Sequence, residues 1–161
     1  MSKPAILGGI PENSKIFPPY NTIGKEEKDA VMAVLDSGEL SGFVANDVPQ
    51  FYGGQQVQAL EKEFCNHFKV KYAVSVNSAT SGIYCMLMAM GVGPGDEVIT
   101  SPYTMHATAS SILQCGAVPI FADIEEDTFG LDPDSVQKNI TENTKGILAV
   151  NIFGHAARLN E

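Results

Sequence analysis

The sequence predicts an α/β fold with a mostly parallel sheet and flanking helices. From residue 72 onward, short runs of β-branched and aromatic residues alternate with helical segments, and such alternation is typical of parallel strands covered by helices. Hydrophobic residues make up 44% of the chain and charged residues 18%, which is enough apolar material for a core. A length of 161 residues suits one domain or part of a larger one.

In the first part of the chain we expect an extended arm, two helices and a long loop between the helices. Four prolines within residues 1–22 block a helix there and predict an extended arm. Apolar residues at helical spacing predict one helix over residues 25–37 and another that includes residues 57–68. Between them, residues 38–54 contain four glycines and predict a long loop, and loops of this length are usually functional or disordered.

The rest of the chain alternates between predicted strands and helices. We expect strands over residues 72–76, 97–100, 118–122 and 146–152, and helices over residues 79–90 and 106–115 and from Asp132-Pro133 onward. Pro119 lies in the third of these strands and predicts a sheet edge or a strand start. The last residues, 153–161, resemble the beginning of another loop and helix. Because a parallel sheet needs both faces covered, we expect an incomplete protein.

Charge and cysteine usage exclude several classes of protein. Nineteen acidic residues against ten basic ones give a net charge of −9, and Arg158 is the only arginine. Nucleic-acid binding and attachment through a polybasic membrane patch both need basic residues that this chain lacks. Three widely spaced cysteines indicate neither a disulfide framework nor a zinc site. Without a signal-peptide core or a long apolar stretch, the protein is expected in the cytoplasm.

The strongest local signal for function is Asn77-Ser78-Ala79-Thr80-Ser81-Gly82, between a predicted strand and an apolar helix. A helix start offers unpaired N–H groups and the positive end of the helix dipole, and small hydroxylated residues let an anion come close. This combination predicts a phosphate-binding turn. The alternative is ordinary N-capping by Ser78 or Thr80.

Other polar or glycine-rich segments carry weaker signals. Residues 91–95, with three glycines, follow a helix and precede a strand, so they predict a connecting turn and not a dinucleotide-binding loop. The acidic residues among 123–127 could bind a metal, although a solvated turn is the favoured interpretation. His106 lies in a strand-to-helix loop, where ligands collect in α/β sheets, and it is either a site residue or a helix cap.

Several motifs, in order, resemble the DegT/StrS-type sugar aminotransferases, which are PLP-dependent enzymes of the aspartate-aminotransferase fold (fold type I). They are Ser37-Gly38-Glu39-Leu40-Ser41-Gly42, Asn77-Ser78-Ala79-Thr80-Ser81-Gly82, Gly93-Pro94-Gly95-Asp96-Glu97-Val98-Ile99-Thr100, Tyr103-Thr104-Met105-His106-Ala107-Thr108, Gly116-Ala117-Val118-Pro119-Ile120-Phe121-Ala122-Asp123 and Ile140-Thr141-Glu142-Asn143-Thr144-Lys145. The resemblance covers nearly the whole chain and implies the N-terminal portion of that fold. It implies residues 1–56 as the arm, first helix and substrate-side loop, and residues 57–161 as the first part of the large PLP-binding domain.

The resemblance also implies roles for individual residues. Thr80 and Ser81, with the backbone of Ala79, would hold the phosphate of pyridoxal 5′-phosphate. Met105 lies where the family usually has an aromatic ring stacked on the pyridine, and its polarizable sulfur can cover a ring face. Neighbouring His106 is the substitute candidate for that position.

The implied activity is transfer of an amino group, with glutamate as donor, to a nucleotide-linked keto-sugar by a cytoplasmic homodimer. The Schiff-base lysine of the family lies beyond the position that matches Glu161, so the resemblance implies that this polypeptide alone is inactive. One alternative is a catalytically inactive truncated homologue that acts as a binding protein. Another is a different fold-type-I PLP enzyme, such as a desulfurase or lyase.

Overall fold

The computed structural model describes residues 3–13, 15–16, 18–40 and 42–160. The chain divides into two compact units, Met1–Ala73 and Val74–Glu161, called here the helical unit and the α/β unit and each described by itself. The predicted domain boundary between residues 56 and 57 stays a prediction. Within the described residues, no helix combines the length and the apolar character needed to cross a membrane.

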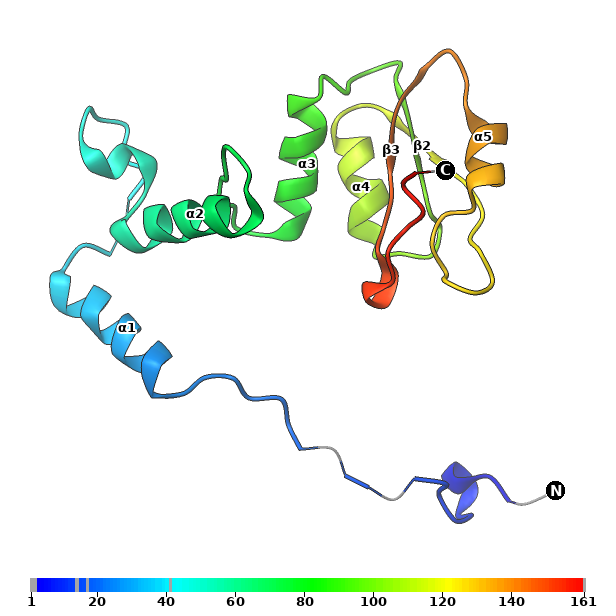
Figure 1. The fold of residues 1–161 in the computed structure, drawn as a ribbon, viewed down its shortest axis with the longest axis horizontal. Coiled ribbons are helices and arrows are strands. Elements are labelled where there is room, and N and C mark those ends of the chain that lie inside the picture. The colour runs from blue at the N-terminus through cyan, green and yellow to red at the C-terminus, as the bar shows by residue number, and fades with distance from the viewer. Residues whose placement is uncertain (1–2, 14, 17, 41, 161) are drawn as a thin grey trace. The chain divides into compact units, whose positions relative to one another are not determined.

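The helical unit contains the two predicted helices, α1 (Lys25–Ser37) and α2 (Gln55–Phe68) (Figure 1). The Glu27 carboxylate accepts a hydrogen bond from the Gly24 N–H at 2.6 Å and so caps the start of α1. Gly38 ends this helix with a φ of 72°, since glycine adopts left-handed backbone without steric cost. The predicted arm includes one short 3-10 helix, Ala5–Leu7.

The predicted long loop between α1 and α2 has an internal framework. It contains a 3-10 helix, Pro49–Tyr52, and the Phe43 N–H donates to the Gln50 carbonyl at 2.6 Å. The Gln58 side-chain amide donates to the Gly53 carbonyl at 2.7 Å, which ties the loop to the first turns of α2. A Cβ on Gly42 would lie only 2.3 Å from the Gly54 nitrogen, so the two ends of the loop need glycine to approach this closely.

The α/β unit is built on a three-stranded parallel sheet, which confirms the predicted fold class. Its strands are β1 (Glu97–Thr100), β2 (Val118–Phe121) and β3 (Thr144–Leu148), in the order β2-β1-β3. Pro119 therefore lies in an edge strand, as predicted, because a central strand needs every N–H for its two neighbours. The turn over residues 91–95 connects a helix to β1 and is the predicted connector.

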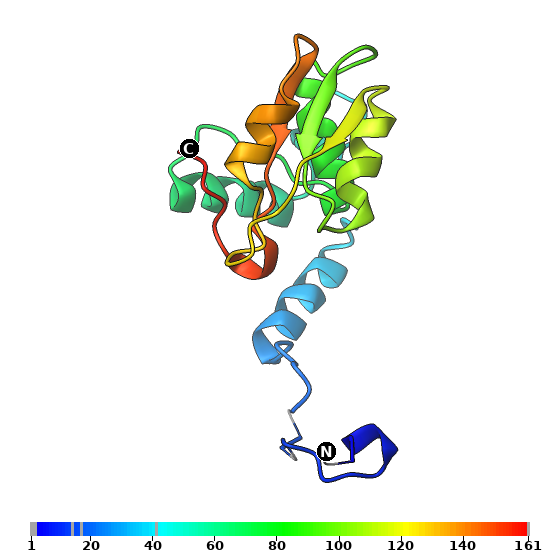
Figure 2. The same ribbon diagram turned by 90° about the vertical axis from the view of Figure 1, so that its right-hand side faces the viewer.

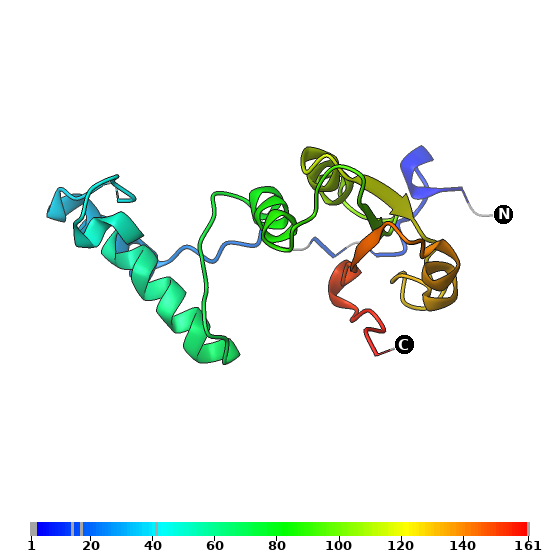
Figure 3. The same cartoon turned by 90° about the horizontal axis from the view of Figure 1, so that it is seen from above.

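Helices cover both faces of this sheet (Figures 2 and 3). Successive residues of β1 point to opposite faces, so Val98 packs in one core cluster and Ile99 in the other. The helices α3 (Ala79–Ala89) and α4 (His106–Gln114) cover the Val98 face, and α5 (Pro133–Asn139) covers the Ile99 face. The Asp132 carboxylate caps α5 by accepting from the Asp134 N–H at 3.1 Å, as the Asp-Pro pair predicted.

Two predicted elements at the margins of this unit are wrong, and the predicted last strand has different bounds. Residues 72–76 form no strand; their sequence alternates like one, but among the described residues only β1, β2 and β3 pair in the sheet. The exposed fractions of Tyr72 and Val74 are 75% and 79%, as expected for a segment with no neighbouring strand. β3 ends at Leu148 instead of residue 152, because the chain turns into the 3-10 helix Ile152–Gly154. Residues 155–160 contain a turn and no helix.

Candidate cofactor-binding site

The predicted phosphate-binding turn lies at the carboxyl edge of the parallel sheet. Because α3 precedes β1 and α4 follows it, both helices run opposite to that strand and begin at the edge where β1 ends (Figure 1). Ligands of open α/β sheets bind in the crevice outside this edge. We therefore expect a ligand of the α/β unit to bind at the first turns of α3 and α4.

The Ser78 hydroxyl caps the first turn of α3. Its oxygen accepts a hydrogen bond from the Ser81 N–H at 3.1 Å, and it lies 3.1 Å from the Ser81 hydroxyl. The Gly82 N–H donates to the Ser78 carbonyl at 3.0 Å. The capping interpretation is thus confirmed for Ser78 and is wrong for Thr80.

Capping by Ser78 leaves donors available for an anion. The first N–H groups of any helix lack acceptors inside the helix. Among the described residues, the structure assigns no acceptor to the N–H groups of Ala79 and Thr80 and no partner to the Thr80 hydroxyl. These donors, the partly exposed Ser81 hydroxyl and the positive end of the α3 dipole fit a phosphate group.

A buried hydroxyl links this turn to the neighbouring helix. Ser111 in α4 is fully buried, and its oxygen lies 3.2 Å from the Thr80 carbonyl oxygen and 2.8 Å from that of Ala107. The hydroxyl hydrogen can be shared between the two carbonyls. This contact fixes the start of α3 against the first turns of α4.

Met105 and His106 lie at the start of α4. Met105 is the N-cap residue, its side chain makes no capping hydrogen bond, and 72% of its surface is exposed. His106 is the first helical residue and is exposed, so the interpretation of His106 as the helix cap is wrong. The loop before them is held by the buried Ser101 hydroxyl, which accepts from the Tyr103 N–H at 2.9 Å.

The predicted site residues therefore gather in one unit. Ala79, Thr80 and Ser81 begin α3, Met105 and His106 begin α4, and the two helices pack side by side. The glycine-rich loop over residues 38–54 belongs to the helical unit.

The acidic segment after β2 is engaged in contacts of its own. Glu125 pairs with Arg158 at 3.0 Å, between Oε1 and Nε, and accepts a hydrogen bond from the Thr128 hydroxyl. In the part of the chain that the structure describes, no three His, Cys, Asp or Glu side chains gather closely enough to hold a metal ion.

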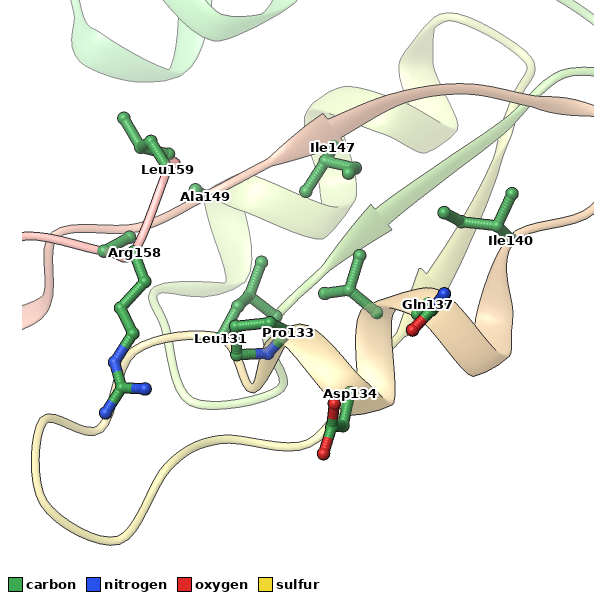
Figure 4. A pocket seen from close by; sticks show the side chains of 11 residues that line it. Leu131, Pro133, Asp134, Gln137, Ile140, Ile147, Ala149, Arg158 and Leu159 are labelled. Atoms are coloured by element: carbon green, nitrogen blue, oxygen red, sulfur yellow. The ribbon is translucent and has the colours of Figure 1, made fainter. Parts of the chain in front are cut away.

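A groove of the α/β unit lies away from the predicted site (Figure 4). It has a volume of about 510 Å³ and lies between α5, β3 and residues 157–159. Its lining is mostly apolar, with Leu131, Ile147 and Leu159 as its larger members. The Arg158 side chain extends from the groove to pair with Glu125. The groove therefore provides apolar surface and few groups for chemistry.

Sequence reasoning did not find Ser111. The available signal is a serine four residues after Ala107 in the predicted helix, directly before the apolar residues Ile112 and Leu113. Such a serine can donate to the carbonyl four residues earlier, but its contact with residue 80 is nonlocal.

Comparison with known proteins gives the same assignment as the motifs. The model of the DegT/DnrJ/EryC1/StrS aminotransferase family matches residues 21–161. The spore coat polysaccharide biosynthesis protein SpsC of Bacillus subtilis is 42% identical over 146 residues, which cover 89% of this chain and 35% of SpsC. This chain thus spans about a third of the length of the curated relatives that it matches.

Two solved structures extend the likeness to the fold and the cofactor. An aminotransferase from Psychrobacter cryohalolentis matches with a TM-score of 0.78 and 33% identity, over 88% of this chain and 34% of that one. The PLP form of Spr1654 from Streptococcus pneumoniae matches with a TM-score of 0.75 and 33% identity, over 84% of this chain and 32% of that one. The predicted fold and the predicted cofactor, pyridoxal 5′-phosphate, are confirmed. Because the family model covers nearly all of the sequence, the chain belongs to the DegT/DnrJ/EryC1/StrS aminotransferase family.

Proposed function

We propose that the first turn of α3 binds the phosphate of pyridoxal 5′-phosphate. The N–H groups of Ala79 and Thr80 and the hydroxyls of Thr80 and Ser81 are the donors, and the helix dipole adds a favourable potential. The observation that carries this proposal is that the Ser78 side chain caps the helix, while the proposed donors have no acceptor among the described residues. The turn can therefore accept an anion without losing its cap.

We further propose that Met105 covers one face of the pyridine ring, with His106 as the alternative. Met105 is well exposed, and its side chain takes no part in capping α4. A thioether sulfur packs favourably on aromatic rings. Replacing each residue by alanine separately distinguishes them, since only the residue that covers the ring should alter the absorbance of bound cofactor.

The proposed reaction of the intact protein is transfer of an amino group from glutamate to a nucleotide-linked keto-sugar. The cofactor supplies the electron sink for this chemistry when it is bound. The proposal of a sugar substrate is supported by the family and by the name of the relative SpsC, which refers to polysaccharide biosynthesis. A cytoplasmic homodimer is part of the same proposal.

We also propose that residues 1–161 alone do not carry out the reaction. The α/β unit has two lysines, Lys138 and Lys145. Lys145 is the second residue of β3 and Lys138 lies near the end of α5, so both are toward the amino edge of the sheet. The first turns of α3 and α4 lie at the carboxyl edge. Neither lysine is therefore placed to reach a cofactor bound at α3.

The test is cofactor retention by the intact protein with Thr80 and Ser81 both changed to alanine. Loss of two hydrogen bonds to a charged phosphate, at about 1.5–3 kcal/mol each, should raise the PLP dissociation constant at least about 100-fold. Thr141→Ala is the matched control, because Thr141 is exposed and precedes β3 at the opposite edge. Equal PLP content in both variants would contradict the phosphate assignment. Intact protein without any PLP affinity would favour the alternative of a binding protein.

A further inference from the structure

Three aromatic side chains meet beyond the carboxyl edge of the sheet, each from a different loop. Tyr103 follows β1, Phe129 follows β2 and Phe153 follows β3. The ring centroids of Tyr103 and Phe129 are 5.8 Å apart at 45°, and those of Tyr103 and Phe153 are 6.2 Å apart at 73°. Both separations lie within the range of favourable aromatic pairs. We call these three residues the aromatic clasp.

Two members of the clasp have a backbone conformation that bulky residues rarely adopt. Phe129 has a φ of 59° and Phe153 a φ of 50°, and a positive φ is a genuine outlier for a large side chain. Such residues persist only where their surroundings hold them in place. The Phe129 N–H donates to the Glu125 carbonyl at 3.0 Å, and the Asn151 side chain accepts from the Ala157 N–H at 2.9 Å and closes the loop around Phe153.

The clasp is connected to the start of α4 by a short, well-bonded loop. Tyr103 precedes Met105 by two residues. Between them, the Thr104 hydroxyl is 2.9 Å from the hydroxyl of buried Thr108. At the other end of the loop, the Thr100 hydroxyl donates to the Leu148 carbonyl at 2.9 Å and joins the ends of β1 and β3. Hydrogen bonds of the Thr100 and Thr104 hydroxyls thus hold the loop at two points, and the clasp holds the Tyr103 ring between them.

We propose that the aromatic clasp is a positioning device that sets where Met105 and His106 lie over the cofactor ring. Within this unit the clasp rings keep exposed fractions of 45%, 44% and 81% for Tyr103, Phe129 and Phe153, so they bury less apolar surface than core residues do. Their contacts act between loops. The rings of Phe129 and Phe153, from the two neighbouring loops, hold Tyr103 in place. The position of Tyr103 in turn determines where the residues that follow it lie. This inference rests on the proposed function, because it assumes that the α4 start faces the cofactor.

The test uses Phe129→Leu and Phe153→Leu in the intact protein. Each substitution removes one ring pair, so the dissociation constant of PLP should rise about threefold to tenfold. The visible circular dichroism of bound PLP should also change, which a general loss of stability would not produce in folded protein. Phe121→Leu is the matched control: Phe121 lies in β2, is 51% exposed and belongs to no ring pair recorded among the described residues. It should leave both measurements unchanged.

Three further substitutions separate the loss of a ring from a failure to fold. Phe129→Tyr and Phe153→Tyr retain a ring and should restore the cofactor dichroism. If the leucine variants fail to fold, Phe129→Asn removes the ring while keeping a residue that tolerates left-handed backbone. A folded Asn or Leu variant with wild-type PLP affinity and dichroism would overturn the inference.

The alanine substitutions at Thr80 and Ser81 separate this inference from the proposed function. If they weaken PLP binding and the clasp variants do not, the phosphate assignment stands and the clasp inference is wrong. If they leave PLP binding unchanged while the clasp variants alter affinity and dichroism, the positioning role stands and the phosphate assignment is wrong.

Discussion

The hydroxyl of Ser111 lies 3.2 Å from the carbonyl oxygen of Thr80, and this contact joins two helices that begin at the same edge of the sheet. Ser111 is fully buried. Its oxygen also lies 2.8 Å from the Ala107 carbonyl oxygen, so its one hydrogen is shared between a bond within α4 and a bond that links α4 to α3. Ser111 therefore links the start of α3, which has the proposed phosphate donors, to α4, which begins beside Met105, the proposed cover of the pyridine ring.

Ser111→Ala should lower the free energy of unfolding by about 1 kcal/mol, the usual net value of one hydrogen bond. Ser110→Ala is the control, because the one hydrogen bond of the Ser110 hydroxyl among the described residues is to the Ala107 carbonyl, at 3.3 Å within its own helix. Urea denaturation of the two variants gives the comparison. The account is contradicted if Ser110→Ala destabilises the protein as much as Ser111→Ala.

Gly116→Ala should be clearly destabilising. Gly116 ends α4 with a φ of 79°, and an added Cβ would lie 3.0 Å from the Pro94 ring. The unfavourable backbone costs about 1–2 kcal/mol, and the contact with the proline adds to it. Gly93→Ala is the control, since a Cβ there meets nothing within 4 Å and its φ is not positive. Thermal unfolding of both variants should show a lower Tm for Gly116→Ala alone.

Acidification should weaken the start of α1. The Gly24 N–H, which donates to the Glu27 carboxylate, holds the pKa of Glu27 below its ordinary value of 4.5. A lowered pKa means that this cap stabilises the helix fully above the ordinary value and is lost as the pH falls through the lowered one. An NMR titration of the Glu27 carboxyl should give a midpoint below 4.5. A midpoint at or above the ordinary value would show that the cap is absent in solution.

The three cysteines should differ in reactivity. Burial raises the pKa of the Cys115 thiol, so less of the reactive thiolate is present at a given pH, and the side chain is also shielded in the core. Cys85 is exposed. Alkylation followed by peptide mass mapping should modify Cys85 well before Cys115, with the Cys115 rate rising as the pH is raised. Equal rates in folded protein would contradict the burial of Cys115.

Elements with local signals were predictable. The helices from residue 79 and from residue 133 begin at the side-chain caps Ser78 and Asp132, and the helix from residue 25 ends at Gly38. The proposal of an anion site at the first turn of α3 follows from the sequence for the same reason, since the proposed donors and the cap lie within six residues. Pro119 indicated an edge strand because its missing N–H is a local property.

Nonlocal features were not predictable from the sequence. Residues 72–76 have a strand-like pattern, but a strand also needs a partner, and pairing depends on distant segments. The Ser111 contact spans 31 positions, and the aromatic clasp joins loops after three different strands. The residue type at positions 129 and 153 gives no sign of a positive φ, since glycine or asparagine at the position itself is the usual sign of one.

The most direct test of the phosphate assignment is a crystal structure of the intact protein with bound pyridoxal 5′-phosphate. We predict phosphate oxygens within hydrogen-bond distance of the N–H groups of Ala79 and Thr80 and of the hydroxyls of Thr80 and Ser81. We also predict that Met105 or His106 lies against the pyridine ring. A phosphate bound elsewhere, with the first turn of α3 left to solvent, would contradict it.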